Sequence, residues 1–227
     1  MIGRVPQKPR EAGQRVISFK AIGEGLRYIY TQPMILSTMV LDFFATFFSS
    51  ANTLLPFFAR DILKVGPVAY GWLSAAQSIG ATAAALVISQ VNQIRKQGPI
   101  FLISVVIFGM ATILFGVSKT VVLAMVALII IGAADTVSMI IRNTIRQLQT
   151  PDEMRGRMTS INQIFFMGGP QLGEVESSIV AQLFGVPVAI VTGGIGCILT
   201  VLLISRKWPQ IMEYNGDEPI KAGAAAD

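Results

Sequence analysis

The chain has 227 residues and a mass of 24.4 kDa, with 52% hydrophobic and 14% charged residues and a mean hydropathy of +0.61. Soluble domains usually carry about 25% charged residues, so this composition excludes an ordinary soluble globule, and its hydrophobicity excludes a disordered chain. The sequence has no histidine and a single cysteine, Cys197, which excludes an internal disulfide, a multi-cysteine metal site and histidine-dependent hydrolysis. No cofactor and no metal ion is expected.

Residues 1–32 are expected to form a cytoplasmic linker and a surface helix. They contain six Lys or Arg residues and no long apolar segment, so they do not resemble a signal peptide. Apolar residues at intervals of three or four positions predict a helix over residues 14–32 that ends at Pro33. These apolar residues are Val16, Phe19, Ile22, Leu26 and Ile29.

Six apolar runs follow, and together they predict a transmembrane domain over residues 33–207. Each run has about the 20 residues that a helix needs to cross about 30 Å of hydrocarbon. Strict alternation of apolar and polar residues is absent, which argues against a membrane β-barrel. The predicted spans are 34–55, 69–89, 99–117, 121–141, 158–184 and 186–204.

The distribution of basic residues predicts the orientation of these spans. If the N-terminus is cytoplasmic, fifteen of the eighteen Lys and Arg residues fall on the cytoplasmic side and only Arg60, Lys64 and Lys119 fall outside. By the positive-inside rule both termini are therefore expected in the cytoplasm. The net charge of +5 is explained in this way, and no nucleic-acid partner is expected.

The connections between the predicted spans are short. Residues 118–120 and 184–186 form near-minimal outer turns, whereas 142–157 is longer and is interpreted as a cytoplasmic extension of the fourth helix that stops at Thr150-Pro151. Residues 208–227 are polar and are expected to be a disordered cytoplasmic tail. Pairs of small residues four positions apart, such as Gly80 and Ala84, predict close contacts between helices.

Three stretches resemble a known family. Residues 24–29 (EGLRYI) with Pro33, residues 143–157 (NTIRQLQTPDEMRGR) and residues 168–173 (GGPQLG) are similar to segments in the C-terminal half, helices seven to twelve, of major facilitator superfamily transporters. The resemblance is to the branch of drug and siderophore exporters that includes the enterobactin exporter and the macrolide efflux proteins. One departure is that residues 89–99 lack the Gly-x-x-x-Asp-x-x-Gly-Arg pattern of many superfamily members.

The resemblance implies an all-α membrane protein whose six transmembrane helices form one half of the superfamily fold. It implies a secondary transporter, not an enzyme, that exports an amphipathic small molecule such as a drug or siderophore across the plasma (bacterial inner) membrane. Its partners would be the lipid bilayer, the small-molecule substrate, and a missing N-terminal six-helix half or a second copy in a homodimer. The alternatives are an inactive fragment of a truncated or split transporter gene, or a structural membrane subunit.

Acidic residues inside the spans are the candidates for proton coupling, because a carboxylate at membrane depth usually faces a cavity or a partner. Asp135 is the first candidate, since small residues flank it, followed by Glu174 and then Asp42. Proton antiport is expected because the sequence has no Gly-x-x-x-x-Gly-Lys-Ser/Thr nucleotide-binding motif. Other interpretations stay open: Asp42 could bond locally near the interface, and Asp135 could pair with Arg142.

The fifth span is the most polar and is expected to line an aqueous cavity. The candidates for a substrate cavity are Asn162, Gln163 and Gln171 on this span, with Gln77 on the second span. A gating kink is predicted within the same span, because proline removes a helical hydrogen bond and glycine loosens the backbone; it comprises Gly168, Gly169, Pro170 and Gly173.

Arg155 and Arg157 precede the fifth span. They are interpreted either as a cytoplasmic gate that clamps acidic groups or helix ends, or as an anchor beside anionic lipid.

Overall fold

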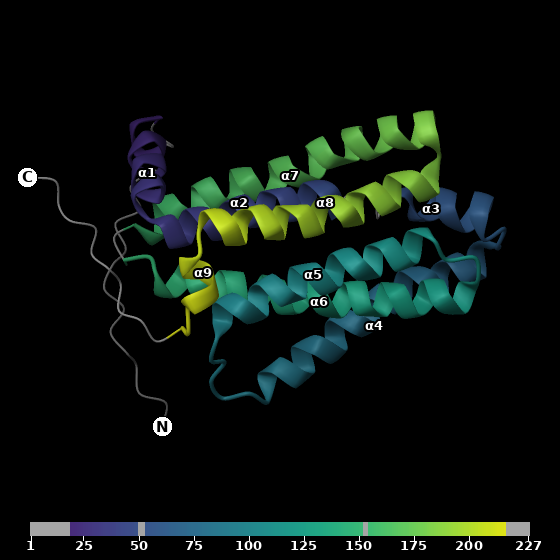
Figure 1. Ribbon diagram of the computed structural model, residues 1–227, viewed down its shortest axis with the longest axis horizontal. Helices are drawn as coiled ribbons and strands as arrows, with labels where there is room; N and C mark the ends of the chain where they lie inside the picture. Colours follow the sequence, from purple (N-terminus) through teal and green to yellow (C-terminus); the bar gives the residue numbers. More distant parts are fainter. Residues whose placement is uncertain (1–18, 50–52, 152–153, 217–227) are drawn as a thin grey trace, which may run out of the picture.

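The computed structural model describes residues 19–49, 53–151 and 154–216, and it is helical throughout this part of the chain apart from short connections (Figure 1). The elements in chain order are α1 (Phe19–Thr31), α2 (Pro33–Ser49), α3 (Leu55–Phe57), the π-helical turn η2 (Phe58–Ile62), α4 (Pro67–Ser89), α5 (Gln97–Gly116), α6 (Val121–Leu148), α7 (Arg155–Phe184), α8 (Val186–Lys207) and α9 (Gln210–Glu213).

The six apolar runs coincide with α2, α4, α5, α6, α7 and α8. The first run differs in extent, because α2 ends at Ser49 and a separate short helix, α3, begins at Leu55. In the described part of the chain, four helices, α4, α5, α6 and α8, are long and apolar enough to cross a membrane. Helix α2 is apolar but has only 17 residues. Helix α7 has 30 residues, but it is too polar to be counted among these four. The assignment of six membrane spans remains a prediction.

Local sequence signals explain where the helices begin and end. Pro33 occupies the first position of α2, where its missing N–H costs nothing. The Thr120 hydroxyl caps α6 by accepting a hydrogen bond from the amide of Leu123 at 3.4 Å. At the other end of α6, the Thr150 hydroxyl donates to the carbonyl of Arg146 at 2.6 Å, just before Pro151. Gly185 alone separates α7 from α8, and its φ of +91° is a conformation that favours glycine.

The helices pack in a pattern that suggests an internal repeat. The main contacts join α4 with α6, α2 with α7, α5 with α8, α5 with α6, and α2 with α8. If α2 is exchanged with α6, α4 with α7 and α5 with α8, the same five contacts result. The pattern is what two three-helix repeats produce.

Glycines allow the closest helix approaches. A Cβ atom on Gly80 of α4 would lie 1.9 Å from the carbonyl oxygen of Ile129 in α6, and one on Gly132 of α6 would lie 2.0 Å from the carbonyl oxygen of Gln77 in α4. Gly109 of α5 and Gly194 of α8 face each other in the same way. Only glycine fits at these crossings, so backbones pack as closely as they do in many membrane proteins.

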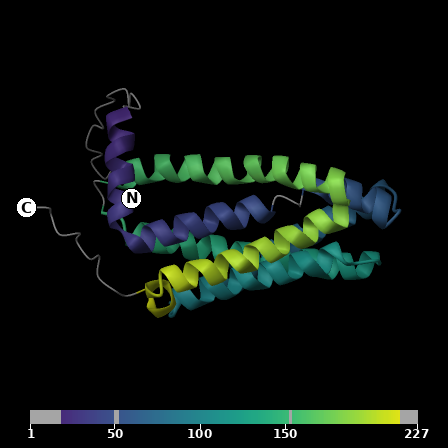
Figure 2. The ribbon, with the colours of Figure 1, turned by 45° about the horizontal axis from the view of Figure 1, so that its top comes forward.

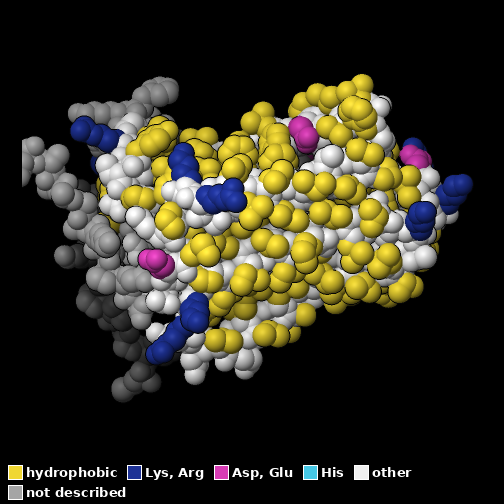
Figure 3. All heavy atoms as spheres, in the orientation of Figure 1, with side chains coloured by type: hydrophobic (Ala, Val, Ile, Leu, Met, Phe, Trp, Pro, Cys, Tyr) yellow, Lys and Arg dark blue, Asp and Glu magenta, His cyan; other side chains and the backbone are white. Residues whose placement is uncertain are grey.

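The outer surface of the bundle is apolar. Figure 3 shows hydrophobic side chains over the middle of one face, with Lys and Arg gathered toward its two ends. Large side chains that a soluble protein would bury are exposed, including Val122 at 73%, Leu203 at 67% and Leu86 at 62%. A continuous apolar surface between charged ends is suited to a lipid bilayer, so this is an integral membrane protein.

Two small helices lie at one end of the bundle, which we call the α1–α9 end. Figure 1 shows α1 standing across the long helices there, and Figure 2 shows α1 and α9 at the same end from a second direction. The predicted helix over 14–32 is confirmed from Phe19 to Thr31, and its earlier residues lie outside the described part. Ile29 of α1 packs with Met39 of α2 and Ile161 of α7.

The tail prediction was wrong for residues 208–216. The short helix α9 packs against α5, and Ile211 and Tyr214 are 0% and 5% exposed. The Gly98 amide donates to the Tyr214 carbonyl at 3.0 Å, and Gly98 has no side chain to separate the two segments. A few apolar residues in a polar sequence are therefore enough to fix this segment to α5. Residues 217–227 lie outside the described part.

Candidate functional site

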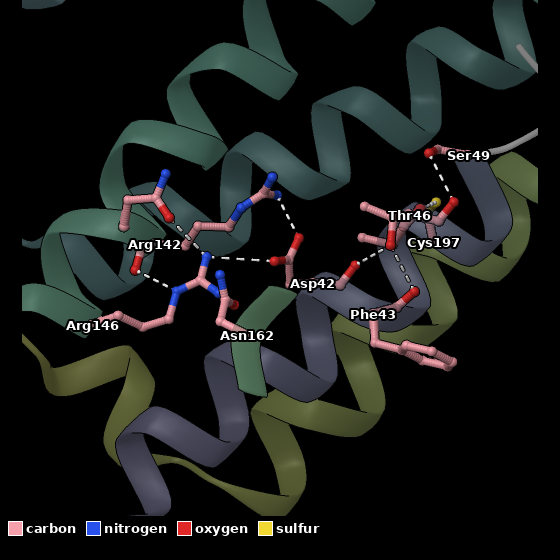
Figure 4. A network of polar contacts seen from close by, with 10 residues as sticks. Asp42, Phe43, Thr46, Ser49, Arg142, Arg146, Asn162 and Cys197 are labelled. Atoms are coloured by element: carbon pink, nitrogen blue, oxygen red, sulfur yellow. Dashed lines mark hydrogen bonds and ion pairs between the residues drawn. The ribbon is translucent and has the colours of Figure 1, made fainter. Parts of the chain in front are cut away.

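A buried ion cluster joins three helices near the α1–α9 end (Figure 4). Asp42 on α2 faces Arg142 and Arg146, which are four residues apart on α6 and therefore on one face of that helix. Arg142 Nη1 lies 2.8 Å from Asp42 Oδ1, and Arg146 Nη2 lies 3.4 Å from Asp42 Oδ2. The exposed fraction of each of the three side chains is only 5–7%.

Arg146 extends the cluster to α7. Its Nη1 donates to Asn162 Oδ1, its Nη2 donates to Asn143 Oδ1 at 3.0 Å, and its Nε donates to the carbonyl oxygen of Arg142 at 3.2 Å. One guanidinium therefore connects α2, α6 and α7. Asn162 was predicted to line a substrate cavity, and in this structure it is held by Arg146.

The cluster places two guanidiniums on one carboxylate. The Arg142–Asp42 contact is an ion pair without good hydrogen-bond geometry, and Arg142 Nε has no hydrogen-bond partner among the described residues. Removing a charge from water costs several kcal/mol, which a buried ion pair recovers only with well-placed partners. One buried carboxylate therefore has to balance two buried guanidiniums.

Asp135 lies about two turns before Arg142 on α6. It is partly buried and lines a cavity of about 20 Å³. Arg142 and Ser138 of α6 also line this cavity, as do Thr46 and Ser49 of α2. Its volume fits about one water molecule. Among the described residues no basic group lies within ion-pair distance of Asp135, so Arg142 pairs with Asp42 instead, although Asp135 interacts electrostatically with both.

The remaining polar candidates do not converge on this cluster. Gln163, Gln171 and Glu174 are exposed on the side of α7 that faces away from the bundle, and Glu176 is partly buried. Gln77 is partly buried on α4, whose main neighbour is α6. The structure thus brings Asp42, Asp135 and Asn162 together and separates them from the polar face of α7.

The predicted gating segment lies against α2. Helix α7 is continuous through Pro170. A Cβ atom on Gly169 would lie 2.5 Å from the Thr46 hydroxyl and 3.0 Å from the carbonyl oxygen of Phe43, whereas one on Gly168 would meet nothing within 4 Å. Gly173, one turn later, is buried. Gly169 therefore allows α7 to approach α2, and its role in gating remains a prediction.

The two arginines of the predicted cytoplasmic gate lie in different surroundings. Arg155 lines an open pocket of about 440 Å³ between the adjoining ends of α6 and α7. Arg157 is exposed and its Nη1 lies 3.7 Å from the sulfur of Met154. Both the gate and the lipid-anchor interpretations remain predictions.

Sequence reasoning missed the central role of Arg142 and Arg146. The available signal was their spacing of four residues at the end of an apolar helix, because two arginines on one buried face require a carboxylate nearby. The identity of that carboxylate was not available, since Asp42 is about 100 positions away and helix packing brings it close.

Residues 5–220 match the family described as transmembrane secretion effector, a family of the major facilitator superfamily. The chain belongs to this family. Its members are transporters, not enzymes, and the packing described above fits half of such a fold.

Several similar proteins carry the name enterobactin exporter EntS. The protein of Salmonella typhimurium is 24% identical over 216 residues, which are 95% of this chain and 51% of that protein. The Citrobacter koseri protein is 23% identical over 219 residues, or 96% and 51% of the two chains. The protein of Escherichia coli O1:K1 is 28% identical over 156 residues, or 69% and 36%. The chain thus spans about half the length of the first two relatives.

Proposed function

We propose that the chain acts as one six-helix half of a secondary active exporter in the plasma (bacterial inner) membrane, with both termini in the cytoplasm. The observation that carries the proposal is the side of α7 that exposes Gln163, Gln171 and Glu174. These polar side chains lie at membrane depth among exposed apolar ones of the same helix, such as Met167 and Leu172. Polar groups in contact with lipid are unfavourable, so this side calls for a protein partner or a water-filled cavity.

A second six-helix unit meets this need. Transporters of the superfamily place the substrate between two such units near the middle of the membrane. The unit is either an N-terminal half or a second copy of this chain. Purification in mild detergent followed by mass measurement tests the proposal, and we expect an assembly larger than the 24.4 kDa chain. Robust transport by a demonstrated monomer in liposomes would contradict it.

The substrate class that we propose is an amphipathic small molecule such as a siderophore or a drug. The similarity to proteins named enterobactin exporter supports a siderophore. Enterobactin and ethidium are suitable probes of the two classes in proteoliposomes that contain the assembled protein. Accumulation of neither probe, when a proton gradient is imposed and the assembly is intact, would contradict this substrate class.

Export is proposed to be coupled to proton entry through Asp135, with Glu174 second and Asp42 third. Asp135 lines a cavity that fits about one water molecule, and Arg142, which pairs with Asp42, lines the same cavity. Glu174 is exposed on α7, close to Gly169 and Pro170. Asp42 is the weakest candidate, because two guanidiniums hold its charge.

The coupling test compares isosteric neutral variants in the assembled protein. Asp135→Asn should abolish transport driven by a pH gradient while leaving substrate binding and downhill exchange intact, because only the proton site is lost. Glu174→Gln is the matched variant outside the ion cluster. Normal gradient-driven transport in both variants would show that neither Asp135 nor Glu174 is the coupling residue.

A further inference from the structure

An open pocket is found at the α1–α9 end of the bundle. It lies between the last turns of α6 and the first turns of α7 and has a volume of about 440 Å³. This falls within the range of small-molecule sites, about 300–1,000 Å³, and far exceeds the space that a water molecule needs. Its lining residues are Asn143, Arg146, Gln147, Thr150, Arg155, Met158, Thr159 and Asn162.

The lining of this pocket is positive and rich in hydrogen-bond donors. It contains two guanidiniums, three amide side chains and two hydroxyls, and no carboxylate among the described residues that line it. Helix α7 begins at Arg155 without a side-chain cap on its first amides, so the positive end of its dipole is also directed to this region. Guanidinium and amide N–H groups around a concave space form a binding environment for an oxyanion.

Arg146 is a buried side chain of the pocket lining that several contacts hold in place. Its side chain is 7% exposed and is held on one side by Asp42 at 3.4 Å. Toward the pocket it donates to the neutral amide oxygens of Asn162 and Asn143, which both line the space. An entering oxyanion can replace these neutral acceptors with charged ones, and charge-assisted hydrogen bonds are about twice as strong as neutral ones.

We propose that this pocket binds the oxyanion group, a carboxylate or a phosphate, of an organic molecule. Arg146 and Arg155 contact the charged oxygens, and the apolar side chain of Met158 together with the remaining volume accommodates the organic part. The group belongs either to a water-soluble anion or to a lipid headgroup. In the first case the pocket is where an exported anion is first bound, which rests on the proposed export function.

Binding to the purified full chain is measurable without any transport. The probe is phenyl phosphate, benzamide serves as an uncharged aromatic control, and the chain is held in nanodiscs of phosphatidylcholine. We expect the chain to bind phenyl phosphate and not benzamide. Arg155→Gln should weaken binding by about tenfold or more, because one charged contact is lost. The matched control is Arg157→Gln, which removes an exposed arginine two residues away that does not line the pocket.

Variants at Arg146 and Thr159 extend the test, and those at the exposed Thr159 separate binding from folding. Arg146→Gln should also weaken binding, but it disturbs the ion cluster, so its fold must be checked by thermal unfolding. Thr159→Asp introduces a negative charge at an exposed position in the lining and should abolish binding, whereas Thr159→Ser should retain it. Equal binding by wild-type chain, Arg155→Gln and Thr159→Asp would overturn the proposal, as would the absence of phenyl phosphate binding.

A second membrane composition distinguishes the two sources of the oxyanion. If a lipid headgroup fills the pocket, phenyl phosphate binding will be lost in nanodiscs that contain phosphatidylglycerol, and Arg155→Gln will reduce the retention of that lipid. If a soluble anion is the ligand, binding will be the same in both membranes. Failure of the export proposal is seen separately, as absent transport by an assembly whose pocket still binds phenyl phosphate.

Discussion

Arg142 Nη1 lies 2.8 Å from Asp42 Oδ1, and each of these side chains is only 5% exposed. Asp42 comes from the first long helix and Arg142 from the fourth, so the contact joins the two three-helix units that the packing pattern indicates. Arg146 shares the same carboxylate and carries the connection on to α7 through Asn162. These contacts make the relative positions of α2, α6 and α7 depend on one negative charge.

Asp42→Asn is expected to destabilise the fold strongly. The substitution leaves two buried guanidiniums without their carboxylate, and breaking a buried ion pair in this way costs about 3–5 kcal/mol of the free energy of unfolding. The measurement is denaturant unfolding in detergent micelles. The matched control is Asp61→Asn, which removes the exposed Arg60–Asp61 pair and should leave stability unchanged.

A double variant separates loss of the pair from loss of shape. Adding Arg142→Gln to Asp42→Asn removes one of the two orphaned charges, so the double variant should be more stable than the sum of the two single effects predicts. Additive effects would show that Asp42 and Arg142 are not coupled and would argue against the ion cluster as described.

The helices of this protein follow closely from the sequence, whereas the ion cluster does not. Six apolar runs of spanning length, Pro33, Gly185 and Thr150-Pro151 fix most helix boundaries, because these signals act locally. The pairing of Asp42 with Arg142 depends on which helices pack together. Hydrophobic periodicity predicts the helices but not their neighbours. Prediction of α9 failed for a similar reason: Ile211 and Tyr214 are buried only because α5 passes close to them.

Gly169→Ala is expected to push α7 away from α2. The added methyl group would lie 2.5 Å from the Thr46 hydroxyl, which is itself held by the carbonyl oxygens of Asp42 and Phe43. Overpacking of this kind costs about 1–3 kcal/mol, more than alanine gains over glycine in a helix. Gly168→Ala is the matched control, since nothing lies within 4 Å of its added methyl group, and it should be neutral or slightly stabilising. Thermal unfolding of both variants gives the comparison.

Tyr214→Phe is expected to loosen α9. The Gln149 side chain donates to the Tyr214 hydroxyl at 3.1 Å, and the carbonyl oxygen of Gln149 accepts a bond from the Tyr28 hydroxyl at 3.4 Å, so one residue at the end of α6 holds both α9 and α1. Without the Tyr214 hydroxyl, the buried Gln149 amide loses its acceptor, at a cost of about 1–3 kcal/mol. Hydrogen exchange of residues 210–214 should become faster, while that of α5 should not change. Tyr30→Phe, at a 73% exposed position, serves as the control.

The contact between Tyr28 and Gln149 should fail at high pH. Burial raises the pKa of the Tyr28 phenol above its usual value of about 10. A pKa that is higher in the folded state contributes stability below the unfolded pKa, and this stability is lost as pH rises through the folded pKa. Protease protection of α1 should therefore be constant from pH 7 to 9 and fall above about pH 10. Tyr28→Phe should flatten this fall; an unchanged profile would show that another group causes it.

The last prediction concerns which end of the bundle faces the cytoplasm. Lys64 and Lys119 are exposed at the end opposite α1 and α9, and Lys96 is exposed on the connection between α4 and α5. Cys197 is buried beside the carbonyl oxygen of Ala45, so Cys197→Ser removes the native thiol with little change of volume. In that background, a single cysteine in place of Lys64 or Lys119 should react with a membrane-impermeant maleimide in intact cells. A cysteine in place of Lys96 should react only after the cells are opened, because fifteen of the eighteen Lys and Arg residues lie on its side of the membrane by the predicted topology. Labelling of the Lys96 position from outside would show that the orientation is the opposite of the predicted one. The oxyanion pocket would then open on the outer side of the membrane.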